Sequence, residues 1–66
     1  MGLKWVDVQE IAIQLSDLHE EIDPRYINFV KLRQLVLELP EFNDDPERSG
    51  ERVLEAIQAA WIEELD

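Results

Sequence analysis

The sequence has no cysteine and a single histidine, His19, among its 66 residues. Without a thiol the chain can form no disulfide, and it offers no thiolate for catalysis, for a zinc finger or for a metal cluster held by its own sulfur ligands. His19 has Ser16 near it on the same helical segment, which does not make a catalytic triad. We therefore expect a protein that is not an enzyme.

Long hydrophobic runs are also missing. No segment approaches the roughly 18 to 20 apolar residues that a membrane span needs, and the N-terminal stretch MGLKWVDVQE has no basic segment followed by an apolar run. A chain of 66 residues can build one hydrophobic core and leaves little room for a deep cavity beside it. These features predict one monomeric domain over residues 1–66, soluble in the cytoplasm and without a membrane partner.

Basic residues are scarce, with six against sixteen acidic ones and a net charge of −10. A surface this negative repels phosphate backbones, so nucleic acids are disfavoured as partners. The excess is uneven: from Glu38 to the end ten acids face only Arg48 and Arg52, whereas residues 1–37 hold six acids and four bases. The C-terminal half is therefore the negative pole, and we expect it to bind something basic or metallic.

Signals for β-strands are few, because the segment VLELP alternates only briefly and no Asn-Gly or Asp-Gly hairpin signal occurs. Apolar residues instead recur at the spacing of amphipathic helices in three stretches. The first consists of Val8, Ile11, Ala12, Leu15 and Leu18, the second of Phe29, Leu32, Leu35, Val36 and Leu39, and the third of Val53, Leu54, Ile57, Ala60, Trp61 and Leu65. The pattern predicts a small, compact all-α domain.

The first helix should begin directly after Asp7. Asp7 and Glu10 have the spacing of a capping box, in which the Asp7 carboxylate accepts from backbone N–H groups of the first turn and Glu10 reaches back. Val6 and Ile11 stand at the positions of a hydrophobic staple. We expect this helix to end near residues 19–21.

Prolines mark the limits of the second helix. Asp23-Pro24 predicts a short additional turn, because proline at a first helical position gives up only an N–H that would be unpaired anyway. Asn28 is the expected cap of the helix that follows, and Pro40 disfavours helical geometry at the residue before it. The domain then has three to four helices. Trp61 should lie in the core, while Trp5 fits either the core or an interface.

The segment FNDDPERSGERVLEAI, residues 42–57, leads into the last helix and is dense in charge. A structural interpretation makes Asp45 or Ser49 the cap of that helix and lets its arginines pair with glutamates three residues later. It does not explain Glu51 and Glu55, like charges that oppose each other by about 0.2–0.5 kcal/mol at i and i+4. A functional interpretation uses the crowded carboxylates as ligands for a divalent cation or as a docking face for a basic protein. The residues alone leave both open.

Several short motifs span the whole chain. They are GLKW at residues 2–5, DDP at residues 44–46 and LEAI at residues 54–57, with Asp7, Glu10-Ile11, Asp23-Pro24, Phe29, residues 39–42, Ser49, Glu51, Trp61 and Glu64. At these separations the motifs resemble those of the IscX family, the small acidic protein of bacterial iron–sulphur cluster assembly operons. The sequence departs from the family pattern at Asn43, where a third acid is usual, at Val30, where a Thr or Ser cap is common, and at Arg33, often His.

The resemblance implies a compact helical fold related to winged-helix domains. It also implies a regulator or iron adaptor that docks an acidic face on the cysteine desulfurase of the pathway, on a basic surface shared with frataxin, and that binds ferrous iron weakly. Ferredoxin or the cluster scaffold protein are open as further partners.

The resemblance also implies which carboxylates serve each role. Those implied as iron ligands are Asp44, Asp45, Glu51, Glu55 and Glu41. Those implied for partner binding are Asp7, Glu10, Glu41, Asp44, Asp45, Glu47, Glu51 and Glu55. Solvated carboxylates hold iron weakly and without selectivity, because other oxygen-liking divalent ions compete and no imidazole or thiolate adds preference.

Two other functions fit parts of the sequence. A dedicated iron carrier, donating to the cluster scaffold, would use the same carboxylates mainly as ligands. A winged-helix DNA-binding protein would use the acid-free stretch from Pro24 to Leu37, which holds Arg25, Lys31 and Arg33. Three positive charges against a net charge of −10 disfavour DNA binding.

Overall fold

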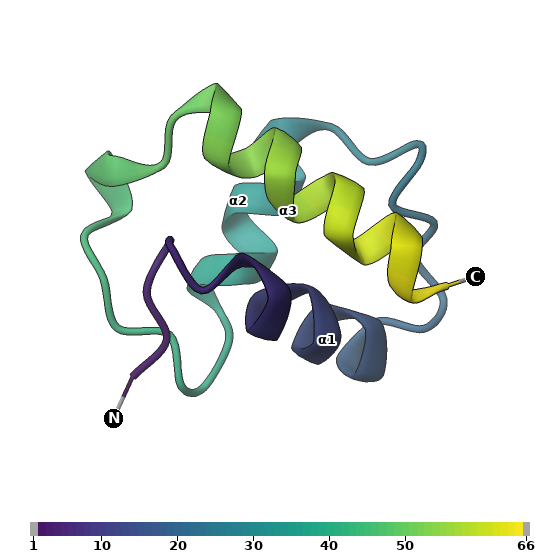
Figure 1. Ribbon diagram of the computed structural model, residues 1–66, viewed down its shortest axis with the longest axis horizontal. Helices are drawn as coiled ribbons and strands as arrows, with labels where there is room; N and C mark the ends of the chain where they lie inside the picture. Colours follow the sequence, from purple (N-terminus) through teal and green to yellow (C-terminus); the bar gives the residue numbers. More distant parts are fainter. Residues whose placement is uncertain (1, 66) are drawn as a thin grey trace.

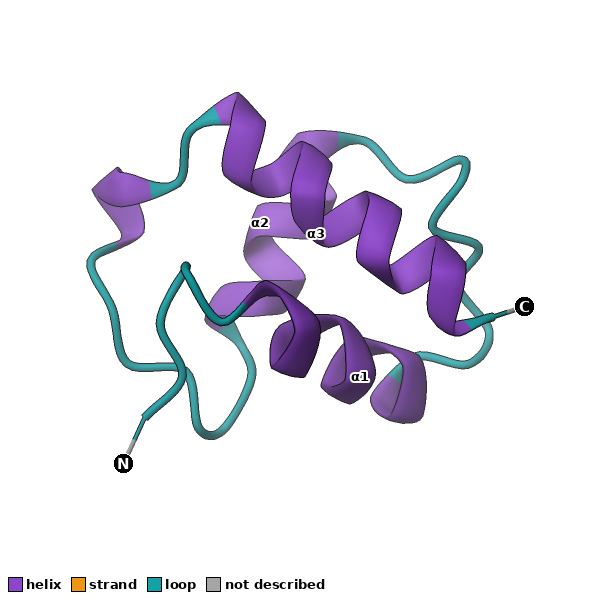
Figure 2. Cartoon of the chain, in the orientation of Figure 1, coloured by secondary structure: helices purple, strands orange, loops and turns teal. Residues whose placement is uncertain are grey.

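The computed structural model describes residues 2–65, which fold into three α-helices and one short 3₁₀-helix (Figure 1). The elements are α1 (Val8–Leu18), α2 (Phe29–Leu37), η1 (Pro46–Arg48) and α3 (Glu51–Glu64). No strand forms among residues 2–65 (Figure 2), and the one β-like feature there is an isolated bridge between Leu3 and Phe42. The predicted all-α class is confirmed, while the winged-helix relation stays a prediction.

The helices enclose one core. α1 and α3 lie alongside each other and make the most extensive contact between helices, while α2 crosses behind them (Figure 1). The hydrophobic core cluster consists of Leu3, Trp5, Ile11, Ala12, Leu15, Leu32, Leu35, Val36, Leu39, Leu54, Ile57, Ala60 and Trp61. Those on the helices follow the helical spacing of the sequence, and Trp61 is in the core as predicted, while Leu3, Trp5 and Leu39 reach the core from outside the helices. Within residues 2–65 no helix has the length and apolarity to cross a membrane.

The start of α1 is where the sequence placed it, but the predicted capping box is wrong. Asp7 is the residue before the helix, yet its carboxylate makes no capping bond. Instead Oδ2 accepts from the backbone N–H of Lys4 at 2.9 Å, and the Asp7 N–H donates to the Lys4 carbonyl at 2.9 Å. This reciprocal pair closes a turn and directs the carboxylate away from the helix. Val6 is 85% exposed, so no hydrophobic staple forms.

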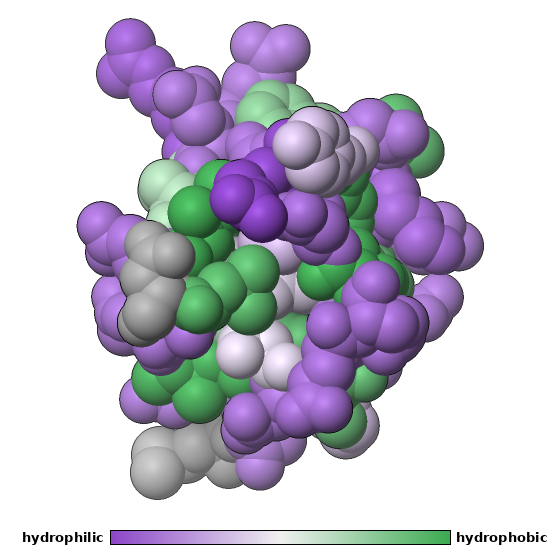
Figure 3. Space-filling model, turned by 90° about the vertical axis from the view of Figure 1, so that its right-hand side faces the viewer, coloured by the Kyte–Doolittle hydropathy of each residue, from purple (hydrophilic) through white to green (hydrophobic). Residues whose placement is uncertain are grey.

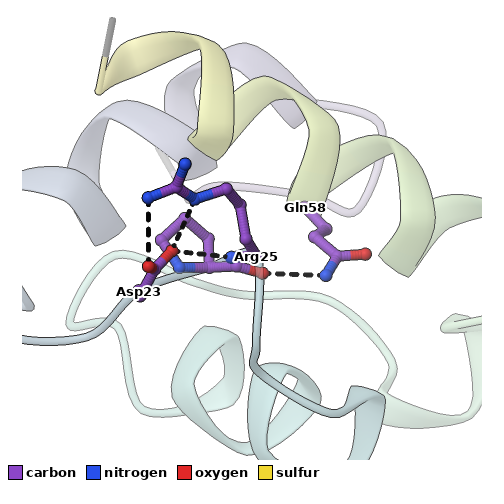
Figure 4. A network of polar contacts seen from close by, with 4 residues as sticks. Asp23, Arg25 and Gln58 are labelled. Carbon is purple, nitrogen blue, oxygen red and sulfur yellow. Dashed lines mark hydrogen bonds and ion pairs between the residues drawn. The ribbon is translucent and has the colours of Figure 1, made fainter.

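The connection from α1 to α2 is fastened by polar contacts (Figure 4). Asp23 forms the expected turn, since its carbonyl accepts from the N–H of Tyr26 at 3.1 Å, but no helix begins there. The Asp23 carboxylate accepts from the backbone N–H and the guanidinium of Arg25, and these hydrogen bonds lower the pKa of Asp23. Gln58 on α3 donates from Nε2 to the Pro24 carbonyl at 2.8 Å, which fixes the loop to the last helix.

The cap of α2 is confirmed. The Asn28 side chain accepts from the backbone N–H of Lys31 at 2.8 Å, and the helix ends at Leu37, ahead of Pro40.

The end of α1 was expected near residues 19–21. The last helical residue is Leu18, and His19 is the C-cap residue, the first of that range.

Candidate functional site

The acidic segment, residues 41–55, follows α2 after three intervening residues, passes through η1 and enters α3. It lies on the side of the molecule opposite the C-terminal ends of α1 and α3 (Figure 1). The N-terminal arm, residues 2–5, runs beside its first part. The Leu3 N–H donates to the Glu41 carbonyl at 2.6 Å, and the Asn43 N–H donates to the Leu3 carbonyl at 2.8 Å. Two segments almost forty residues apart in sequence are thereby joined by backbone hydrogen bonds.

Trp5 links the arm to the core and to the acidic segment at once. The side chain is 2% exposed, and its ring packs edge-on against Phe42 with centroids 4.7 Å apart. Its backbone N–H donates to Asp44 Oδ2 at 3.0 Å, and its indole Nε1 donates to the Asp45 carbonyl at 2.7 Å. The question that the sequence left open is therefore answered: Trp5 is a core residue whose polar edge holds the acidic segment.

Asp44 uses both carboxylate oxygens inside the protein. Oδ2 accepts from the Trp5 N–H, and Oδ1 accepts from the N–H of Asp45 at 2.7 Å. These backbone bonds, that of Trp5 first, lower the pKa of Asp44, and the positive charges of Lys4 and Arg48 act in the same direction. Asp44 is thus an ionised group that fastens the N-terminal arm to the acidic segment.

This role of Asp44 predicts an acid dependence of stability. Because its pKa is lower in the folded protein than the ordinary 3.8, the ionised carboxylate stabilises the fold at and above pH 4 or so, and the contribution is lost as the pH falls through the lowered pKa. We expect the melting temperature of Asp44→Asn to fall less steeply below about pH 4 than that of the wild type.

Thermal unfolding followed by circular dichroism checks this at several pH values. Asp17→Asn is the matched control, since Asp17 is exposed and its carboxylate makes no hydrogen bond or ion pair within the part of the chain that the structure describes. The stability of every variant should still fall somewhat at acid pH, because the pKa of Asp23 is also lowered in the folded protein. If the melting temperatures of the wild type and Asp44→Asn fell equally steeply with decreasing pH, the assigned role would be contradicted.

Asp45 and Ser49 do not cap the last helix, so that prediction is wrong. Asp45 Oδ1 accepts from the Glu47 N–H at 2.9 Å and caps η1. The residue before α3 is Gly50, which has no side chain to cap with. The reason is that the Asp45-Pro46 step starts a short helix of its own, since proline is favoured at a first helical position.

Arg33 on α2 holds the other end of this short helix. Its Nε donates to Ser49 Oγ at 2.9 Å, and its Nη2 donates to the Pro46 carbonyl at 3.1 Å. Ser49 Oγ in turn donates to the same carbonyl at 2.9 Å. The sequence pointed to Arg33 only as a departure from the family pattern and as a possible cation for DNA. Its role in the site could not be predicted, because its partners lie thirteen and sixteen positions further along the chain.

The local ion pairs of the structural interpretation do not form within residues 2–65. The predicted pairs were Arg48 with Glu51 and Arg52 with Glu55. The one ion pair present there joins Arg25 and Asp23, with Nε and Oδ1 3.1 Å apart. Glu47, Glu51 and Glu55 are exposed and have no hydrogen bond or ion pair through their carboxylates in the described chain. Their charges face solvent.

The remaining predicted residues lie apart from this group. Glu41 Oε2 accepts from Gln14 Nε2 of α1 at 3.1 Å. Asp7 is engaged with the backbone of Lys4, and Glu10 is exposed on the first turns of α1. The structure therefore assigns internal contacts to four of the predicted carboxylates, Glu41, Asp7, Asp44 and Asp45.

The arrangement does not form a ready metal site. Within residues 2–65 no three histidine, aspartate or glutamate side chains gather closely enough to hold a metal ion. Of the implied iron ligands, Asp44 already accepts hydrogen bonds through both oxygens, and Asp45 accepts one at η1. Among the implied iron ligands, Glu51 and Glu55 on α3 are the ones whose carboxylates are free to bind a metal ion or a protein partner.

The opposite end of the molecule has a different character. Figure 3 shows apolar side chains gathered between polar ones on the face where the C-terminal ends of α1 and α3 lie. Leu18 and Leu65, at those two helix ends, are 56% and 47% exposed. The uncompensated charge of the acidic segment and this apolar face therefore lie at opposite ends.

Fold and site together define a small, acidic, all-α protein with a charged segment held by internal hydrogen bonds. The chain belongs to the IscX family, because the family model described as iron-sulphur cluster assembly matches residues 3–66. An uncharacterized protein of Pseudomonas aeruginosa is 73% identical over 66 residues, which cover 100% of both chains. The resemblance found in the motifs GLKW, DDP and LEAI is thus confirmed.

Proposed function

We propose that this protein is a non-enzymatic regulator and iron adaptor of iron–sulphur cluster assembly, which docks its acidic segment on a basic surface of a cysteine desulfurase. The observation that carries the proposal is the exposure of Glu47, Glu51 and Glu55, whose carboxylates have no internal cation within residues 2–65. Membership of a family of iron–sulphur cluster assembly supports it.

The distribution of charge favours one orientation of docking. Ten acids and two arginines follow residue 37, whereas residues 1–37 are nearly balanced. Such asymmetry attracts a basic surface over long range, raises the association rate and turns the negative pole toward it. The attraction weakens as salt shortens the Debye length, which is about 10 Å at 0.1 M.

Ferrous iron is the lesser part of the proposal. The free carboxylates would bind it through oxygen alone, so other divalent ions compete and the iron stays exchangeable. Both carboxylate oxygens of Asp44 already accept hydrogen bonds, which would compete with a metal ion, whereas Asp45 uses only Oδ1. The protein partner therefore has the stronger physical basis.

DNA binding gains no support from the geometry. Of the three cations in the acid-free stretch, Arg25 is bound to Asp23, and Arg33 is bound to Ser49 and Pro46. Neither guanidinium is arranged for phosphates.

Titration calorimetry with the cysteine desulfurase of the same assembly system tests the proposal. We expect binding at low salt and an affinity about tenfold lower or more when ionic strength rises from roughly 0.05 to 0.3 M. A titration with sucrose at matching osmolality is the control and should leave the affinity unchanged. Lack of binding at low salt, or an affinity indifferent to salt, would contradict docking by charge.

A further inference from the structure

The middle of the acidic segment has little regular structure of its own. Between Leu39 and the start of α3 the chain has only the three-residue helix η1. A short solvated connection of this kind samples many conformations unless contacts from elsewhere fix it, because each ordered residue loses backbone entropy. The N-terminal arm holds residues 41–44 by backbone hydrogen bonds. The hydrogen bonds that reach residues 45–49 from other parts of the described chain come from two distant side chains.

Trp5 fixes the beginning. Its indole N–H donates to the Asp45 carbonyl, and its ring is held by burial and by the edge-on contact with Phe42. The donor is therefore locked in place before any partner arrives. Asp45, fixed in this way, caps η1 through its carboxylate.

Arg33 fixes the end. Its guanidinium reaches from α2 to Ser49 Oγ and to the Pro46 carbonyl with two different nitrogens. The planar guanidinium determines the direction of both bonds, which the single ammonium of a lysine cannot reproduce. Between these two anchors lies Glu47, and directly after them α3 begins with Glu51.

We infer that Trp5 and Arg33 are positioning residues for docking: they hold residues 45–49 in one conformation, so that a basic partner meets the exposed glutamates already arranged. The inference rests on the proposed function. A preformed surface avoids the entropy lost when a loop is ordered on binding, which raises affinity without adding a contact. Neither side chain needs to touch the partner.

This role can be separated from an effect of charge. Trp5→Phe removes the indole N–H and keeps an aromatic ring, and Arg33→Lys removes the paired geometry and keeps the positive charge. Both variants have the net charge of the wild type. Positioning therefore predicts weaker binding with an unchanged salt dependence, whereas Glu47→Gln should weaken binding and also reduce the salt dependence.

The experiment compares the binding of these variants to cysteine desulfurase with that of two matched controls. Tyr26→Phe removes a polar group from an aromatic ring, and Lys31→Arg exchanges one cation for another. Both residues are exposed, lie outside the acidic segment and make no side-chain hydrogen bond in the described chain. We expect Trp5→Phe and Arg33→Lys each to bind about three to ten times more weakly, with the slope of log affinity against log salt unchanged. Both controls should stay within about twofold of the wild type.

A second measurement does not depend on the partner. Backbone ¹⁵N order parameters of Asp45 and of residues 47–49 should be near the rigid value of about 0.85 in the wild type and fall toward about 0.6 in both variants, while those of α1 and α3 stay unchanged. If the wild type fails to bind desulfurase, the proposed function fails, and the order parameters still decide whether these residues position the segment. Unchanged order at residues 45–49, or an equal loss throughout the core, would overturn the inference.

Discussion

Trp61→Ala is expected to leave most of the protein unfolded at 37 °C. Trp61 is 0% exposed on α3, the helix with the most extensive contact to α1. Truncating a buried tryptophan to alanine costs about 3–5 kcal/mol, and the core of a domain this small rarely supplies more than about 3–5 kcal/mol of net stability. Circular dichroism with urea titration measures the loss.

Trp61→Phe is the matched control for this prediction. The Trp61 Nε1 is buried, and within residues 2–65 it has no hydrogen-bond partner. A buried donor without a partner costs about 1–3 kcal/mol, so phenylalanine removes that cost while keeping most of the apolar ring. We expect the phenylalanine variant to stay folded. An alanine variant as stable as the wild type would show that this core is not what holds the helices together.

The helices could be predicted because their signals are local. The apolar residues of α1, α2 and α3 recur every three to four positions, and Asn28 caps the turn directly after it. Trp61 falls on the same stripe as Leu54 and Ile57, which is enough to place it in the core. None of these inferences requires knowledge of a distant segment.

The N-terminal arm could not be predicted in this way, because periodicity contains no information on which loops pair. Gly2 shows how close the approach is: a Cβ there would collide with the Cβ of Asn43 and lie 3.0 Å from the Glu41 carbonyl. The motifs GLKW and DDP are therefore structural partners, joined through the hydrogen bonds of Trp5 to Asp44 and Asp45. Both motifs could be recognised in the sequence, but the hydrogen bonds that join them could not be predicted from it.

The roles of the carboxylates were hidden for the same reason. Composition counts every acid alike, but hydrogen bonds divide them into anchors, such as Asp44, and exposed charges, such as Glu51 and Glu55. The split depends on donors from the N-terminal arm, from Gln14 on α1 and from the backbone of the acidic segment itself. We therefore expect substitutions at Asp44 to act through the conformation of the acidic segment as well as through charge.

Glu51→Lys with Glu55→Lys is expected to lower the affinity for cysteine desulfurase about 100-fold at roughly 0.1 M salt, because two attractive contacts become repulsive. The matched control is Glu63→Lys with Glu64→Lys. Both pairs are exposed on α3, and each double variant adds four positive charge units to a net charge of −10. Melting curves of both variants check that α3 tolerates lysine at its N-terminal end.

The affinity of these two variants, measured side by side, is the most direct test of docking through the acidic segment. We predict the large loss for the Glu51 and Glu55 variant and a loss of less than about fivefold for the control, which changes the end of α3 near exposed Leu65. Equal losses would mean that the partner responds only to total charge. A larger loss in the control would place docking at the apolar end of the molecule and contradict the proposal.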